Sequence, residues 1–152
     1  MARRFWSRRG TIFLGLTVVL AGAGGWIAYS QTQPTGETLS VTAAYHAAKA
    51  KEVFLIDIRR PDEWAKTGIG EGASPIDMTR EDFIAELDQV TGGDRSAPIA
   101  LICARGVRSR FLTSALRDAG YQKVIDVPEG MLGSFSGPGW LKTGLPVGAY
   151  GG

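Results

Sequence analysis

The single cysteine of this 152-residue chain stands where an apolar run meets a helical pattern, and this junction constrains the fold most. Residues 98–102 form a short continuous apolar run, which is typical of a buried strand. Apolar residues then recur at helical spacing, at Val107, Phe111, Leu112 and Leu116. Cys103 therefore lies in a predicted turn from a strand into a helix.

Such a turn favours a reactive thiolate. Unpaired N–H groups of the loop and first helical turn point at the sulfur, and the helix dipole adds positive potential together with Arg105 and Arg108. We expect these groups to lower the pKa of the Cys103 thiol and favour its nucleophilic form near neutral pH. A structural cysteine, the commoner kind, is expected inside the apolar run rather than at its end beside Gly106.

The first 30 residues have the pattern of an export segment. Residues 1–10 carry four arginines and no acid, and residues 11–36 contain no charged residue. The apolar part, residues 11–29, approaches the roughly 20 residues that span a bilayer and exceeds a signal-peptide core of about 7–15. Residues 1–30 are therefore interpreted as a cleaved signal peptide or an uncleaved signal anchor, which would contact the membrane through residues 11–29.

Either interpretation sends the rest of the chain across the cytoplasmic membrane. The positive-inside rule keeps the N-terminal arginines in the cytoplasm, so we expect a periplasmic domain, soluble or anchored. The Arg8-Arg9 pair leaves twin-arginine export open beside the general route. The candidate cleavage site is Ala28-Tyr29-Ser30.

Beyond the export segment the chain is mildly acidic. The net charge of the whole chain is +2, but setting aside the four N-terminal arginines leaves 13 Lys and Arg against 15 Asp and Glu. This balance gives no indication of nucleic-acid binding. One cysteine also excludes a disulfide within the chain, so an exported Cys103 is either inert or reactive.

The remaining sequence divides into a polar linker at residues 31–38 and a folded domain at residues 39–148. The domain alternates strands and helices, which is typical of an α/β fold with a parallel sheet covered by helices. The predicted helices cover residues 42–51, with Thr42 as N-cap, residues 61–65, 79–90, with a capping box near its start, and 107–119. The predicted strands cover residues 53–58, 74–77, 98–103 and 123–127, and residues 68–72 are predicted as loop.

Asp57 and Cys103 are both predicted near the carboxyl ends of strands, where ligands bind in parallel sheets. A carboxylate beside the sulfur would oppose the thiolate, so we expect Asp57 to brace a loop or an arginine. His46, the only histidine, falls on a predicted surface helix. One histidine and one cysteine predict no zinc site and no Cys–His pair, and no cofactor motif is present.

Four segments, in this order, resemble the rhodanese-like sulfurtransferases over roughly residues 39–147. They are residues 55–59 with 61–64, residues 72–73, residues 103–109, and residues 139–140 with 144–147. The resemblance implies a single domain with a five-stranded parallel sheet, helices on both faces, and Cys103 in a loop whose amides cradle the reacting sulfur. The run 68–73 lacks the histidine and proline frequent in the family, which affects the packing of that loop.

The resemblance also implies a two-step reaction. Cys103 would attack the outer sulfur of thiosulfate or a related donor, release sulfite and become a persulfide. Cyanide or a thiol, including a protein thiol, would then take the sulfur. The implied substrate-binding residues are Ala104, Arg105, Gly106, Val107, Arg108 and Ser109, whose amides would stabilise the persulfide while the two arginines attract the anionic donor.

Three alternatives use similar residues. Phosphatases and arsenate reductases have a longer Cys-x5-Arg loop, whereas the spacing from Cys103 to Arg108 is Cys-x4-Arg, which forms a smaller cradle. Thiol redox chemistry needs a second cysteine for resolution, which the chain lacks. The remaining alternative is an exported rhodanese-like module that carries sulfur to a partner, or binds one, without turning over thiosulfate.

Overall fold

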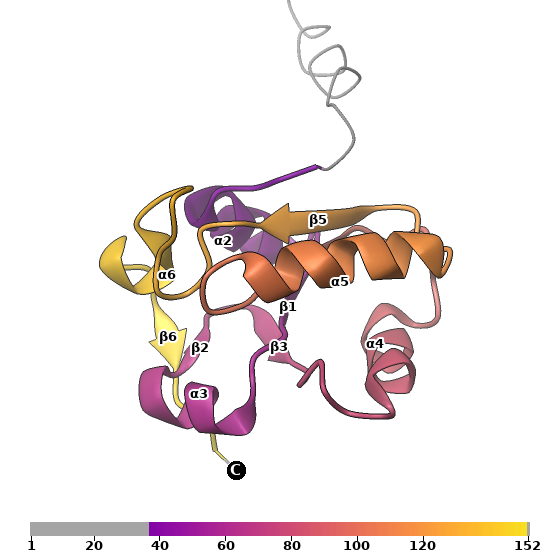
Figure 1. Ribbon diagram of the computed structural model, residues 1–152, viewed down its shortest axis with the longest axis horizontal. Helices are drawn as coiled ribbons and strands as arrows, with labels where there is room; N and C mark the ends of the chain where they lie inside the picture. The colour runs from indigo at the N-terminus through magenta and orange to yellow at the C-terminus, as the bar shows by residue number, and fades with distance from the viewer. Residues whose placement is uncertain (1–36, 152) are drawn as a thin grey trace, which may run out of the picture. The chain divides into compact units, whose positions relative to one another are not determined.

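The computed structural model describes residues 37–151, and its centre is a sheet of four parallel strands (Figure 1). In chain order the strands are β1 (Phe54–Asp57), β3 (Ala73–Pro75), β4 (Ile99–Ile102) and β5 (Val124–Val127). Their spatial order is β3-β1-β4-β5. The short strands β2 (Ile69–Gly70) and β6 (Val147–Gly148) form a separate antiparallel pair.

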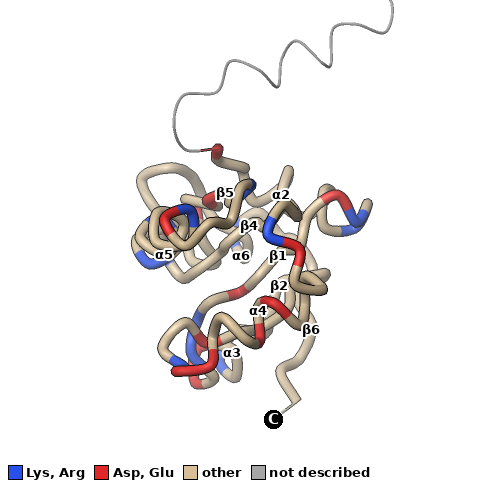
Figure 2. The backbone as a smooth tube through the Cα atoms, turned by 90° about the vertical axis from the view of Figure 1, so that its right-hand side faces the viewer, with Lys and Arg blue, Asp and Glu red and all other residues tan. Residues whose placement is uncertain are grey.

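Helices cover both faces of the parallel sheet. One core cluster joins the sheet to α2 (Val41–Lys49) and α6 (Gly139–Lys142). The other joins its opposite face to α4 (Phe83–Thr91) and α5 (Val107–Asp118). The helix α3 (Pro61–Thr67) follows β1 and carries side chains of both charges (Figure 2). Both clusters consist of residues 39–145, so this part of the chain contains its own hydrophobic cores and is expected to fold alone.

The expected fifth strand does not form. Beside β5 the chain makes only an isolated parallel bridge between Thr38 and Asp126. Around it, the Leu39 N–H donates to the Asp126 carbonyl and the Asp126 N–H donates to the Glu37 carbonyl, both at 2.9 Å. The chain then enters α2 at Val41, so the segment beside β5 is too short to continue the ladder.

Side-chain hydrogen bonds set two helix starts differently from the sequence prediction. The N-cap of α2 is Ser40 rather than Thr42, because the Ser40 Oγ accepts the Ala43 N–H at 3.2 Å. The Asp77 carboxylate accepts the N–H and the hydroxyl of Thr79 at 2.9 and 2.8 Å. This Asx turn takes the place of the predicted capping box, and α4 begins only at Phe83.

The predicted loop at residues 68–72 contains β2, which pairs with β6 near the C-terminal end of the domain.

The expected export segment at residues 1–30, with its apolar part at 11–29, lies outside the described residues. Within residues 37–151, none of the helices has the length and apolar character needed to cross a bilayer.

A buried ion pair fixes the carboxyl end of β1. The Asp57 carboxylate accepts hydrogen bonds from Nε and Nη2 of Arg59 at 2.9 and 2.7 Å, and both side chains are almost completely buried. Arg59 also donates to the Thr67 hydroxyl at 2.7 Å and to the Gly68 carbonyl at 2.8 Å. The pair therefore ties β1 to the end of α3.

Replacing Asp57 with Ala is expected to lower the free energy of unfolding by about 3–5 kcal/mol, because the Arg59 guanidinium stays buried without its partner. Chemical denaturation measures this change. The double variant Asp57→Leu/Arg59→Met should recover most of the loss, and Asp62→Ala, at an exposed ion pair, should have little effect. Equal stability losses in Asp57→Ala and Asp62→Ala would contradict the assignment.

Candidate active site: the Cys103 loop

The cysteine loop crosses the carboxyl end of the sheet between β4 and α5. Cys103 is a free thiol, only 1% exposed, and its Sγ accepts the Gly106 N–H at 3.2 Å. The thiol also donates to the Ser109 hydroxyl at a sulfur–oxygen distance of 3.6 Å, and this hydroxyl donates to the Gly106 carbonyl at 3.2 Å. The predicted residues 103–109 thus curl around one sulfur atom.

The loop requires glycine at position 106. Gly106 has a φ of +81°, a left-handed conformation that L side chains rarely adopt. A Cβ there would lie 2.1 Å from the carbonyl oxygen of Pro128. The absence of a side chain therefore allows the Gly106 N–H to reach the sulfur while the backbone packs on the neighbouring loop.

A second loop, residues 128–132, holds the first in place. The Met131 N–H donates to the Cys103 carbonyl at 2.8 Å, and the Leu132 N–H donates to the Ala104 carbonyl at 2.9 Å. Gly130 lies so close to Ala104 that a Cβ would be 2.6 Å from its carbonyl oxygen. These contacts occupy backbone groups of the Cys103 loop and fix its path.

Glu129, which no sequence pattern indicated, anchors this second loop. Its buried carboxylate accepts the Val41 N–H at 3.1 Å and the Gly139 N–H at 3.2 Å. It thus satisfies an unpaired N–H in the first turn of α2 and connects α2, the second loop and α6. An acid after a predicted strand gives no sequence signal for a partner 88 residues away.

Arg108 is held by Glu63 of α3, a second residue whose role no sequence pattern indicated. Its Nη1 and Nη2 donate to the Glu63 carboxylate at 2.8 and 2.6 Å. Hydrogen bonding within this pair raises the pKa of Arg108 and, despite partial burial, lowers the pKa of Glu63. The guanidinium charge stays near the Cys103 loop, but its donors point to Glu63.

Asp57 lies at the same edge of the sheet as the cysteine loop. The register of β1 and β4 pairs it with Ile102, the residue before Cys103. Its carboxylate faces Arg59, as described above, and is not a hydrogen-bond partner of the sulfur. The structure therefore brings the sequence-predicted site residues to one edge while Arg59 neutralises the nearby carboxylate.

A cavity of about 430 Å³ lies beside the loop and carries apolar and basic side chains. Arg105 and Lys142 line it, and neither forms an ion pair with a residue of the described domain. The apolar side chains of Val107 and Phe135 also line it, and both are largely exposed. This combination provides positive charge for a small anion next to the cysteine loop.

Asp126 and Ser109 form a polar group behind the loop. Both side chains are buried, and burial raises the pKa of the Asp126 carboxyl, an effect that the Ser109 hydroxyl opposes. Asp126 was not predicted as a site residue, because it lies within an otherwise apolar strand. Chemically, a buried sulfur facing a backbone N–H and nearby cations suits nucleophilic, covalent chemistry on an anionic substrate.

Comparison with known proteins identifies the domain family of this chain. The family model described as a rhodanese-like domain matches residues 40–133. A Rickettsia rickettsii protein described as an uncharacterized protein RP600 homolog is 24% identical over 117 residues, covering 72% of this chain and 95% of its own length.

Solved structures share the fold. The polysulfide-sulfur transferase homodimer from Wolinella succinogenes matches with a TM-score of 0.59 and 24% identity, over 76% of this chain and 80% of that one. The thiosulfate sulfurtransferase from Pseudomonas aeruginosa matches with a TM-score of 0.60 and 21% identity, over 75% of this chain and 20% of that one. With the family model matching residues 40–133, the chain belongs to the rhodanese-like domain family.

Proposed function

We propose that this protein is a sulfurtransferase that moves a sulfane sulfur from thiosulfate or a related small anion to cyanide or a thiol. The observation that carries the proposal is the Gly106 N–H, which points at the buried Cys103 sulfur. Both residues lie in the loop that leads into α5. Family membership and the sulfurtransferases among the structural neighbours support it.

In the first step the Cys103 thiolate attacks the outer sulfur of thiosulfate. A bond forms between Sγ and that sulfur, and the bond to the sulfonate sulfur breaks with its electron pair leaving on sulfite. In the second step the acceptor anion attacks the outer sulfur of the persulfide, and the electron pair of the broken bond returns to Sγ. Charge balances in both steps, and attack by a thiolate needs no separate general base.

Cationic side chains and backbone amides near Cys103 would stabilise different charges during the reaction. Arg105 and Lys142 are free of ion pairs within the described domain and would attract the anionic donor into the neighbouring cavity. Arg108 adds positive potential near the loop while Glu63 fixes its position. Backbone amides of residues 104–109 would stabilise the persulfide anion after sulfite leaves.

Incubating residues 31–152 with thiosulfate should add one sulfur, about 32 Da, to the protein, and cyanide should remove it as thiocyanate. Intact mass spectrometry and thiocyanate release measure the two steps. Cys103→Ser should gain no sulfur. If folded, reduced wild-type protein forms no adduct, thiosulfate turnover is the wrong reaction and a sulfur carrier or partner-binding module becomes the better interpretation.

Gly106→Ala should reduce sulfur transfer at least tenfold, because the Cβ would displace the loop from Pro128 and move the Gly106 N–H from the sulfur. Steady-state thiocyanate production measures this loss. Gly92→Ala is the matched control, since Gly92 also has a positive φ but a Cβ there would meet nothing within 4 Å. Both variants bear the left-handed strain of about 1–2 kcal/mol, so equal activity loss would contradict a special role for Gly106.

We also propose that the domain is exported and works in the periplasm, soluble or held by residues 11–29. The four arginines in residues 1–10 and the uncharged stretch at 11–36 support this proposal. Export would place Cys103 in a compartment where disulfides form. The chain has no second cysteine with which Cys103 could form an internal disulfide.

Cell fractionation followed by intact mass should find the domain outside the cytoplasm. A mature chain that begins at Gln31 would indicate a cleaved signal peptide, whereas retention of residues 1–30 in the membrane fraction would indicate an anchor. Recovery of the full-length chain in the soluble cytoplasmic fraction would contradict export.

A further inference from the structure

Three large apolar side chains are exposed beside the cysteine loop, and together they are called the apolar face. Phe135 is fully exposed, Val107 is 77% exposed and Phe111 is 70% exposed, whereas the other large apolar side chains at the surface of the described domain reach at most 43%. Val107 and Phe111 are four residues apart and so share one side of α5. Val107 and Phe135 line the same two cavities at the loop, of about 430 and 280 Å³. Apolar side chains gathered in this way mark an interaction surface.

Basic side chains surround the apolar face. Arg105 and Lys142 line the larger of the two cavities, and Arg105 and Arg110 line the smaller one. All three are exposed, and none forms an ion pair with a residue in the range 37–151. Asp126 also lines the smaller cavity but is only 6% exposed. The exposed charged side chains that line the two cavities are therefore all positive.

This clustering does not follow from the composition of the domain. Beyond the four N-terminal arginines the chain has 13 Lys and Arg against 15 Asp and Glu, so its net charge there is negative. Exposed phenylalanines ringed by unpaired cations fit the surface of an anionic bilayer. Aromatic rings enter the boundary between headgroups and acyl chains, while arginine and lysine side chains reach the phosphate groups.

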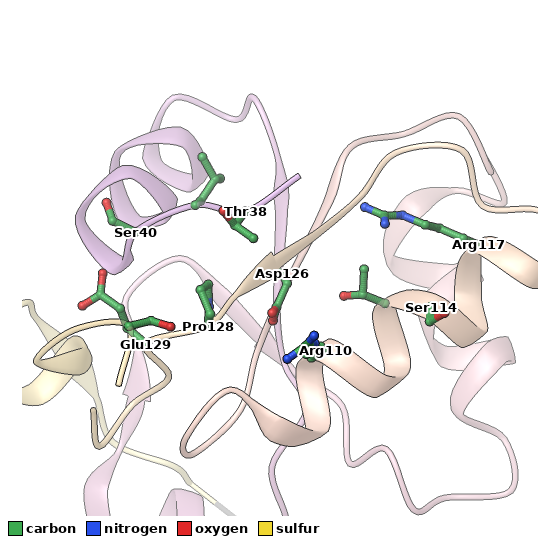
Figure 3. A pocket seen from close by; sticks show the side chains of 11 residues that line it. Thr38, Ser40, Arg110, Ser114, Arg117, Asp126, Pro128 and Glu129 are labelled. Atoms are coloured by element: carbon green, nitrogen blue, oxygen red, sulfur yellow. The ribbon is translucent and has the colours of Figure 1, made fainter. Parts of the chain in front are cut away.

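The point at which the domain begins favours a bilayer over a protein partner. Thr38 lines a groove between α5 and β5 together with Arg110 and Ser136, and Ser136 directly follows the phenylalanine of the apolar face that is fully exposed (Figure 3). Residues 30–37 join this point to the predicted membrane segment at 11–29, and they reach at most about 29 Å when fully extended. That length is about the diameter of a small domain. A tether this short, attached beside the apolar face, would hold that face near the bilayer.

We propose that the apolar face and the cations around it form a docking surface for an anionic lipid bilayer. The two phenylalanines enter the interface, and Arg105, Arg110 and Lys142 bind headgroup phosphates. Docking holds the cysteine loop at the membrane surface. This inference goes beyond the proposed sulfurtransferase reaction and does not depend on it, and only the tether argument rests on the proposed membrane segment.

Co-sedimentation with lipid vesicles tests the docking surface, and using residues 31–152 keeps the test independent of the predicted membrane segment. The domain should bind vesicles that contain phosphatidylglycerol at least fivefold more tightly than vesicles of phosphatidylcholine alone, because the cations need anionic headgroups. Such binding supports the proposal whether or not the domain turns over thiosulfate. Absent binding, or equal binding to both vesicles, overturns it and leaves an acidic protein as the partner of this face, even if thiosulfate turnover is normal.

The double variant Phe111→Ser/Phe135→Ser should weaken binding to the anionic vesicles at least tenfold, because it removes the side chains that enter the interface. Both side chains are exposed, so folding should be unaffected, which circular dichroism checks. The matched control is Phe54→Ser/Ile84→Ser, which removes two apolar side chains that are each 39% exposed and line neither cavity. An equal loss of binding in both double variants would show nonspecific adsorption and overturn the proposal.

The cations are tested in the same way. Arg110→Gln/Lys142→Gln should weaken binding to the anionic vesicles at least tenfold, since two cations near the bilayer surface are removed. Lys51→Gln/Lys66→Gln removes two positive charges from exposed positions that line neither cavity, and it should change binding less than twofold. If the two variants lose binding equally, net charge rather than this face determines vesicle binding, and the docking surface is wrong.

Discussion

The site depends on the close backbone contact between the Cys103 loop and the loop at residues 128–132. Gly106 packs against the Pro128 carbonyl and Gly130 against Ala104, at separations that leave no room for a Cβ. Two hydrogen bonds to the carbonyls of Cys103 and Ala104 hold the loops in this register. This contact fixes the Gly106 N–H on the sulfur, and it extends through Glu129 to α2 and α6, so elements distant in sequence support one N–H group.

Two ion pairs support the same edge of the sheet in different ways. The Asp57–Arg59 pair is buried, so its main effect is to neutralise a carboxylate near the sulfur and to join β1 to α3. The Glu63–Arg108 pair is partly exposed and joins α3 to α5. Because Glu63 occupies the donors of Arg108, that arginine contributes mainly positive potential, whereas Arg105 and Lys142 retain free donors within the described domain for an incoming anion.

The sequence predicted the features that depend on local pattern. The buried run before Cys103, the helical spacing after it and the alternation of elements correctly gave a parallel α/β domain with the cysteine in a strand-to-helix turn. Partners distant in sequence were not predictable, because neither Glu63 nor Glu129 differs locally from a surface acid. The fifth strand was wrong for a related reason, since the Ser40 cap starts α2 before the neighbouring segment can pair further with β5.

That short pairing also shapes the outer side of the domain. A full strand beside β5 would continue the backbone ladder, whereas the single bridge at Thr38 is followed at once by the turn into α2. Both Thr38 and Ser40 line a polar groove of about 730 Å³ between α5 and β5 (Figure 3). Asp126 belongs to both the bridge and the groove. Its backbone pairs with Thr38 in the bridge, and its side chain lines the groove. Its carboxyl group also lies beside Ser109, whose hydroxyl contacts the Cys103 sulfur. The groove is therefore connected to the Cys103 loop through side chains of α5 and β5.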